Sequence, residues 1–163
     1  WVKFSNGSDE VMFTTEDGQA VRFKETDVRA MGRSAAGVTG IRLRKGDHVV
    51  SMDVINKDME TKNLEVLVVT EFGLGKKTAL SDYKVQKRAG SGIKTVKITA
   101  KSGKIMSMMI LDGSEEKDLV IISKHGQTIR TSIKSIATLS RATQGVRVMR
   151  LADGDTVAST AIV

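Results

Sequence analysis

Residues 14–23 read TTEDGQAVRF, and related strings recur as VTEFGLGKKT at 69–78 and ISKHGQTIRT at 122–131. Each string holds a glycine between two stretches of strand-forming residues. Glycine suits the positive backbone angle that a tight hairpin turn requires, so each string predicts a β-hairpin. The three turn glycines are 55 and 53 residues apart: Gly18, Gly73 and Gly126.

Other residues keep fixed distances from the turn glycine in all three copies. A second glycine follows nineteen residues later, and apolar residues recur ten, twenty and twenty-five residues later. Cations recur four, fifteen and twenty-four residues later. In that order they are Arg22, Lys77 and Arg130; Arg33, Arg88 and Arg141; Arg42, Lys97 and Arg150. Chance rarely matches three copies at so many positions, so the chain is predicted to be an internal repeat.

Each repeat predicts four short antiparallel strands. The hairpin precedes a polar loop, a strand with alternating residues such as VTGIRL (38–43), a turn, and an apolar strand such as VVSMDVI (49–55). Four strands in this length resemble a propeller blade, and one blade cannot bury both of its faces without neighbours. We therefore predict an all-β fold of about three propeller-like β-pinwheel blades. The repeat units are expected at about 1–55, 56–111 and 112–163.

The composition of the 163 residues is that of a globular protein, with 40% hydrophobic and 28% charged residues. No cysteine is present, which excludes disulfides, thiolate metal sites and a cysteine nucleophile. No apolar run approaches the length of a membrane-spanning helix, so no membrane partner is expected. The chain opens at Trp1 inside what reads as a strand, and we expect it to be a fragment of a longer protein.

The formal net charge is +7, and the predicted repeats carry 0, +6 and +1 of it in chain order. An excess of this kind suggests a polyanionic partner. Strand alternation predicts that Lys94 and Lys97 lie on opposite faces of one strand. Equivalent cations of successive blades should lie on equivalent rims. A curved wall with cations at a regular step can follow a phosphate backbone.

Residues 86–92 read QKRAGSG, which combines small residues with the charges of Lys87 and Arg88. Small residues allow close approach to a large ligand and free N–H groups for phosphate oxygens, although these glycines could simply turn the chain. Binding of this type would read no bases and would depend steeply on salt. The candidate DNA-contacting residues are Arg22, Arg33, Arg42, Lys76, Lys77, Lys87, Arg88, Lys94, Lys97, Arg130, Arg141, Arg147 and Arg150.

Other chemistries find little support in the sequence. GLGKKT at 73–78 resembles a phosphate-binding loop, but Thr70 stands where that motif needs its first glycine. His48 and His125 occur in unlike contexts, so no metal site is expected. The scarcity of aromatic residues argues against single-strand binding by base stacking. Tyr83 falls at an apolar repeat position and is predicted to be a core residue.

Residues 20–43, 78–99 and 129–151, with their repeated R-x-x-x-G-[VI] phrase, resemble the C-terminal domain of the A subunit of DNA gyrase and that of its topoisomerase IV paralogue. The resemblance implies a β-pinwheel whose blades exchange strands and which binds, bends and wraps double-stranded DNA at its outer edge. It also implies that residues 86–92 are a degenerate form of the family's Gln-Arg-Arg-Gly-Gly-Lys-Gly string, in which Ala89 replaces a glycine and Ser91 a cation.

The same resemblance implies a wider setting for the chain. The family supports ATP-dependent negative supercoiling in a complex of two A and two B subunits in the bacterial cytoplasm, at the nucleoid. The whole enzyme uses ATP and Mg²⁺, whereas no catalytic residue, cofactor or metal is expected within this fragment. Two alternatives remain: a topoisomerase IV module, and a basic propeller that binds acidic proteins. The unbroken VRFKETDVRAMGR phrase at 21–33 favours gyrase.

Overall fold

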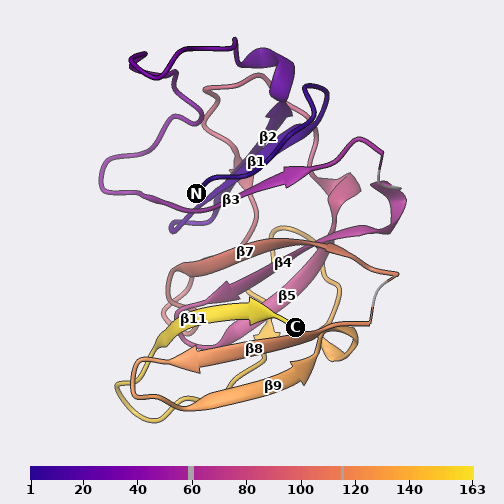
Figure 1. Ribbon diagram of the computed structural model, residues 1–163. Coiled ribbons are helices and arrows are strands. Elements are labelled where there is room, and N and C mark those ends of the chain that lie inside the picture. The colour runs from indigo at the N-terminus through magenta and orange to yellow at the C-terminus, as the bar shows by residue number, and fades with distance from the viewer. Residues whose placement is uncertain (59–60, 115) are drawn as a thin grey trace.

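The computed structural model describes residues 1–58, 61–114 and 116–163, which form three antiparallel sheets in chain order (Figure 1). The first sheet has the strand order β3 (Val49–Ile55), β1 (Glu10–Thr15), β2 (Gln19–Lys24) and β6 (Ile93–Lys94). The second has the order β7 (Ile105–Asp112), β4 (Leu64–Thr70), β5 (Leu74–Ala79) and β10 (Val146–Arg147). The third has the order β11 (Val157–Ile162), β8 (Asp118–Ser123) and β9 (Thr128–Ser132).

The helical content is limited to four single turns of 3₁₀-helix in the described residues. They are η1 (Glu25–Asp27), η2 (Thr61–Asn63), η3 (Leu80–Asp82) and η4 (Ile133–Ser135). No helix within the described ranges has the length and apolar character that crossing a membrane requires. The all-β fold predicted from the repeats is therefore confirmed.

The three predicted hairpins form as β1–β2, β4–β5 and β8–β9. In the first, Phe13 lies opposite Val21 and Thr14 opposite Ala20. The turn glycines have φ angles of +87°, +75° and +87°. Such angles favour glycine because a Cβ would crowd the following carbonyl, which explains why all three turns carry it.

The predicted strand 38–43 and its two equivalents are wrong in extent, whereas the exchange of strands between blades that the resemblance implied is confirmed. Residues 38–43 form no strand, and their equivalents shrink to the two-residue strands β6 and β10. These pair with the preceding repeat: Lys94 lies opposite Gln19, and Arg147 opposite Leu74. Each four-stranded sheet thus borrows its outer strand from the next repeat. Within the described chain, no sheet precedes the first repeat, so residues 38–43 have no strand to join.

The predicted face assignment of the lysines also fails. Lys94 and Lys97 are both exposed, because the strand ends at Lys94 and the chain bends at Val96. A period of two residues applies only while the chain stays extended.

Equivalent backbone hydrogen bonds close the two junctions between neighbouring repeats, which we call the first and second seams. In each seam, three amides of the later repeat donate to carbonyls of the earlier one over 2.7–2.9 Å. In the first seam they run from Gln86, Thr95 and Ile105 to Arg22, Gly18 and Glu16; in the second, from Leu139, Val148 and Val157 to Lys77, Gly73 and Glu71.

The second glycine of the second repeat and that of the third permit this close approach. A Cβ on Gly92 would lie 2.7 Å from the carbonyl oxygen of Ala20, and one on Gly145 would lie 2.8 Å from that of Gly75. Both glycines also have positive φ angles, +74° and +89°. Packing of one repeat on the next therefore accounts for these glycines without a ligand.

Two apolar cores lie between the three sheets, and β4 contributes to both. Val66 and Val68 belong to the core shared with the first sheet, and Leu67 and Val69 to the core shared with the third. Burial on both faces explains why β4 reads as a continuous apolar run. Tyr83 is 1% exposed in the first core, as its repeat position predicts.

The edge strands β3, β7 and β11 contact one another from sheet to sheet, and we call their side of the arrangement the inner side. Ser51 Oγ of β3 donates to the Met108 carbonyl of β7 at 2.6 Å, and Thr160 Oγ1 of β11 donates to Ser107 Oγ of β7 at 2.8 Å. The borrowed strands β6 and β10 occupy the opposite edges of their sheets, where segments from two repeats meet at the outer side.

Replacing Ala89 with glycine should stabilise the chain by about 0.5–1 kcal/mol, because an alanine at positive φ is strained. Ala89 has a φ of +63° and is the one such non-glycine residue in the described ranges. Ala142 holds the equivalent position of the third repeat without that angle, so Ala142→Gly should cost about 0.5–1 kcal/mol. Urea unfolding of both variants measures this, and equal effects would contradict it.

Candidate nucleic-acid interface

The cations that recur four residues after each turn glycine pair with an acid on the facing strand. That acid lies eight residues before the glycine in every repeat. The pairs are Arg22 with Glu10 at 2.5 Å, Lys77 with Glu65 at 2.9 Å and Arg130 with Asp118 at 2.6 Å. The exposed fractions of the three cationic side chains are 10%, 11% and 69%. These acidic partners were not predicted from the sequence, although they keep a fixed distance of eight residues from the turn glycine.

The first two pairs are sealed by the following repeat. The guanidinium of Arg22 also donates to the carbonyls of Leu80 and Tyr83, at 3.1 and 2.9 Å across the first seam. Glu65, the partner of Lys77, accepts a hydrogen bond from Thr138 Oγ1 across the second seam at 2.8 Å. Burial and pairing remove Arg22 and Lys77 from the surface, so their assignment to a DNA-contacting rim is corrected.

Lys76 is buried as well, with 1% of its surface exposed. It stands where the other repeats carry Val21 and Ile129. Its ammonium donates to the carbonyls of Ser140 and Arg141 at 2.7 and 2.6 Å, and to Thr143 Oγ1 at 3.2 Å. Burial, and then the charge of Arg141, lowers the pKa of Lys76 to about 8. Lys76 therefore anchors a loop of the third repeat and does not face solvent.

In the second and third repeats, the arginines fifteen residues after the turn glycine tie their loops to the preceding repeat. Arg88 is half-buried and donates to the carbonyl of Thr39. Arg141 donates to the carbonyl of Lys94, the position equivalent to Thr39, at 3.0 Å, and its guanidinium lies 5.9 Å from the centre of the Tyr83 ring. Part of the hydrogen-bonding capacity of both guanidinium groups is therefore used across the seams.

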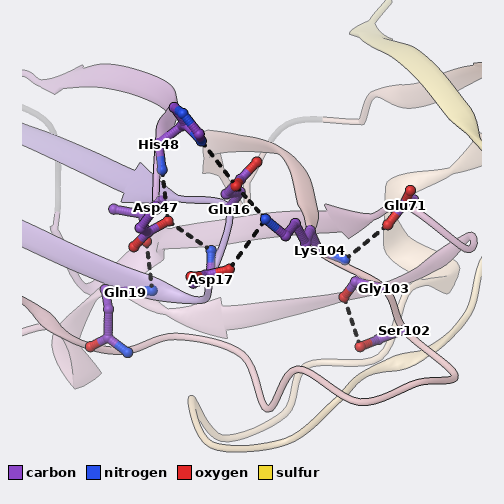
Figure 2. A network of polar contacts seen from close by, with 10 residues as sticks. Glu16, Asp17, Gln19, Asp47, His48, Glu71, Ser102, Gly103 and Lys104 are labelled. Carbon is purple, nitrogen blue, oxygen red and sulfur yellow. Dashed lines mark hydrogen bonds and ion pairs between the residues drawn. The ribbon is translucent and has the colours of Figure 1, made fainter. Parts of the chain in front are cut away.

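A separate ion-pair network closes the first seam at the hairpin end (Figure 2). The ammonium of Lys104 contacts the carboxylate of Glu16 and lies 3.6 Å from that of Asp17. His48 Nδ1 lies 3.0 Å from Glu16 Oε1. Hydrogen bonds from Lys104 and His48 lower the pKa of Glu16, and the bond to Glu16 raises that of Lys104. These acids, with Asp47 nearby, thus pair with a lysine of the next repeat.

Six of the candidate cations are exposed and unpaired, and we call them the rim cations. None of their side chains forms an ion pair or hydrogen bond within residues 1–58, 61–114 and 116–163. They are Arg42, Lys87, Lys94, Lys97, Arg147 and Arg150. Arg33 is also exposed. It is not counted among the rim cations because its equivalents, Arg88 and Arg141, donate to carbonyls across the seams.

Four of the rim cations occupy equivalent positions in the second and third repeats. Lys94 on β6 and Arg147 on β10 occupy the same position of successive outer strands, opposite Gln19 and Leu74. Lys97 and Arg150 follow three residues later, in the irregular segment after each short strand. The same cationic pair therefore occurs in the second and third repeats, whereas the first repeat carries Thr39 and Arg42 at these positions.

The loops of the next repeat bring the other rim cations close. The amide of Arg42 donates to the carbonyl of Gly90 at 2.9 Å, which sets Arg42 beside the loop that carries Lys87. An open hollow of about 1130 Å³ is lined by Arg147, Arg150 and Lys101. Lys101 was missed by the sequence analysis because it matches no repeated cation.

A chain of four-stranded blades that borrow their outer strands is a propeller-like pinwheel. The family model described as "DNA gyrase C-terminal domain, beta-propeller" matches residues 9–56, 64–112 and 117–163. The chain belongs to the DNA gyrase A C-terminal domain family, as the resemblance indicated.

Individual relatives agree with this assignment. The A subunit of DNA gyrase from Staphylococcus epidermidis is 42% identical over 160 residues, which cover 98% of this chain and 17% of that protein. The Staphylococcus aureus protein of the same name is 40% identical over the same share of this chain and 18% of its own length. The chain thus spans under a fifth of the relatives it matches.

Two solved structures share the fold. A DNA gyrase A C-terminal domain aligns with a TM-score of 0.84 and 25% identity, covering 97% of this chain and 52% of that one. The C-terminal domain of a DNA topoisomerase IV aligns with a TM-score of 0.89 and 24% identity, covering 100% and 49%. The two folds do not separate the paralogues, whereas the sequence matches favour gyrase.

Removing Arg22 should destabilise the chain far more than removing its counterpart Arg130. Arg22→Ala leaves Glu10 without its partner inside a closed seam, which should cost about 3–5 kcal/mol. Arg130→Ala breaks an exposed pair and should cost no more than about 1 kcal/mol. Chemical denaturation of both variants measures the difference, and similar losses would show that the seam does not seal the first pair.

The stability of the chain should rise with pH between about 8 and 10 because of Lys76. The unfolded chain keeps this proton up to the ordinary pKa of 10.5, whereas the folded chain loses it near pH 8. The unfolded state then binds more protons, so the free energy of unfolding increases with pH. Above this range the raised pKa of Tyr83, caused by burial, acts in the opposite direction.

The matched variant is Lys76→Met, which restores the apolar character that the other repeats have at this position. Urea denaturation at pH 7.5, 8.5 and 9.5 should show a rising free energy of unfolding for the wild type and a flatter profile for the variant. An unchanged slope in Lys76→Met would rule out Lys76 as the cause.

Proposed function

We propose that the chain binds duplex DNA through the rim cations, without reading its sequence. The observation that carries the proposal is that the exposed, unpaired cations recur with the blades, whereas the buried ones hold the seams. Phosphate contacts from arginine and lysine supply most of the affinity of such binding. Because the part of the chain that the structure describes offers the rim cations no acidic partner, these charges are available to a polyanion.

The outer position of the rim cations favours bending of the bound DNA. Lys94 and Arg147 lie on strands at the far edges of their sheets from β3, β7 and β11. DNA that follows cations around this outer side must curve, at a cost of order 1–6 kcal/mol for a site of 20–30 base pairs. About six phosphate contacts can offset a cost of this size.

The same proposal extends to the longer protein in which the chain would act. The curated relatives are A subunits of DNA gyrase, so we infer that the chain serves as the DNA-wrapping part of such a protein in the bacterial cytoplasm, at the nucleoid. Its partners would be the rest of its own A subunit together with the B subunit of gyrase. Supercoiling, with its ATP and Mg²⁺, would be carried out by those other parts.

A salt titration of binding to a 30-base-pair duplex tests the central claim. If all six rim cations contact phosphates, the logarithm of the association constant should fall with the logarithm of salt concentration with a slope near −5. Lys97→Glu combined with Arg150→Glu should bring the slope closer to zero by about 2. Fluorescence anisotropy measures both, with duplexes of scrambled sequence expected to bind equally.

The matched control changes the net charge equally at cations away from the rim. Lys3 pairs with Asp53 on β3, and Lys134 donates to Glu116 beside η4. Lys3→Glu combined with Lys134→Glu should leave the salt slope unchanged. Equal losses in the two double variants would mean that overall charge, and not the rim, drives binding; a wild-type slope near zero would reject the proposal.

A further inference from the structure

A loop of the third repeat, residues 140–144, lies between β5 and the segment of the second repeat that carries the rim cations Lys94 and Lys97. We call it the bridging loop. The chain enters it from β5, where the amide of Leu139 donates to the carbonyl of Lys77 at 2.8 Å. All of the groups on both sides of the loop belong to the second and third repeats. The loop can therefore transmit the position of β5 to the segment on its other side.

The ammonium of Lys76 holds the first side of the bridging loop. It donates to the carbonyls of Ser140 and Arg141 at 2.7 and 2.6 Å, and to Thr143 Oγ1 at 3.2 Å. Thr143 Oγ1 in turn donates to the carbonyl of Ser140 at 2.9 Å. An ammonium has three hydrogens, and here there is an acceptor for each of them. Because bonds from a charged donor are stronger than those from a neutral one, Lys76 fixes the loop firmly.

The other side of the bridging loop contacts the backbone of the two rim cations. Arg141 Nη1 donates to the carbonyl of Lys94 at 3.0 Å, and the amide of Lys97 donates to the carbonyl of Thr143 at 3.1 Å. The side chains of Lys94 and Lys97 are exposed and have no polar contact of their own within the described ranges. Their positions are therefore set by the backbone, and part of that backbone is held by the loop that Lys76 holds.

The first seam has the same backbone contact without an ammonium. There the amide of Arg42 donates to the carbonyl of Gly90 at 2.9 Å. These two residues are the equivalents of Lys97 and Thr143. Val21 stands where the second repeat has its buried lysine. The backbone contact thus forms without a lysine, and the first seam is an internal reference for what the ammonium adds in the second.

Stability alone does not account for a buried charge at this position. Lys76 is 1% exposed, and the equivalents Val21 and Ile129 show that the fold accepts an apolar side chain there. Replacing buried charges with apolar groups of similar size is often neutral or stabilising, because removing a charge from water is costly. An apolar side chain, however, cannot donate to the carbonyls of the bridging loop. What the ammonium adds is therefore a fixed position for that loop.

We propose that Lys76 is a positioning residue for DNA binding, which acts by fixing the bridging loop and, through it, the backbone of Lys94 and Lys97. The inference rests on the proposed function, since it names a residue that prepares two of the rim cations for phosphate. A cation on a fixed backbone loses less conformational freedom when it binds than one on a loose backbone. Removing the ammonium should therefore weaken DNA binding, although Lys76 itself does not face solvent.

Hydrogen exchange tests the first link in the absence of DNA. Lys76→Met keeps an unbranched side chain and removes all three hydrogen bonds. The amide of Lys97 should then exchange at least about tenfold faster, because its acceptor lies on the released loop. The amides of Thr95 and Arg42 donate to carbonyls across the first seam at 2.8 and 2.9 Å, and their exchange should change by less than about twofold. Exchange detected by NMR at neutral pH measures all three.

The salt dependence of duplex binding tests the second link. Lys76→Met should weaken binding to the 30-base-pair duplex by about three- to tenfold and bring the salt slope closer to zero by about 1. Added to Lys94→Ala combined with Lys97→Ala, it should have no further effect, because the cations that it positions are gone. Added to Arg42→Ala combined with Lys87→Ala, which removes the same charge from other rim cations, it should keep its full effect.

Thr143→Val is a milder variant for the same two measurements. It removes one acceptor of the ammonium and leaves the charge of Lys76 and its bonds to the two carbonyls in place. It should change the exchange of the Lys97 amide and the salt slope in the same direction as Lys76→Met, by a smaller amount. Circular dichroism checks that both variants are folded.

Three results would overturn the inference. Unchanged exchange of the Lys97 amide in Lys76→Met would show that the bridging loop keeps its position without the ammonium. Faster exchange with an unchanged salt slope would show that the position of the loop does not affect DNA binding. An equal loss in both rim-cation backgrounds would mean that Lys76 acts through overall charge or stability.

Failure of the proposed function would look different. A wild type that does not bind the duplex would reject that function and, with it, the role of Lys76 in binding. The exchange of the Lys97 amide would still respond to Lys76→Met in that case, because the link between the two residues does not involve DNA.

Discussion

The exchange of outer strands between neighbouring repeats is the constraint on which the rest of the structure depends. No four-stranded sheet is complete within its own repeat, because β6 and β10 come from the repeat that follows. The turn glycines, the buried cation–carboxylate pairs and the apolar cores all lie at these crossings. Since each repeat is held by its neighbours, its stability is shared with them, and the chain should unfold as a coupled array more than as three separate units.

Because of this strand exchange, the cations fall into two groups: those buried in the seams and those exposed to solvent. Arg22, Lys76 and Lys77 lie inside the seams, where charge is useful only because carboxylates or carbonyls receive it. Lys97 and Arg150 stay outside. The number of positive charges in the sequence therefore exceeds the number that a polyanion can reach. Recurrence in the repeats alone does not distinguish buried cations from exposed ones. An acid that recurs at a fixed distance marks Arg22 and Lys77, whereas Lys76 donates to carbonyls and has no such signal in the sequence.

Much of the fold was predictable from the sequence because hairpins are local. A glycine between β-forming runs specifies its turn with few residues, and three copies strengthen the signal. The outer strands were not predictable in extent, since a two-residue ladder leaves no period to detect. For the site, the repeated exposed cations were identified, but the burial of Lys76 was not: its neighbours in sequence say nothing of the loop at Ser140 and Arg141 that receives its ammonium.

The borrowed strand has a consequence for how such chains can change in length. A repeat inserted by gene duplication brings one short outer strand for the sheet before it and one sheet that receives the outer strand of the repeat after it. The insertion therefore restores the junction that it interrupts. The loss of one whole repeat leaves the flanking repeats just as compatible. Because β4 already packs on both sides, an internal unit is interchangeable with another internal unit. Variation in copy number therefore requires no new surface chemistry, only a change in the curvature that successive blades accumulate.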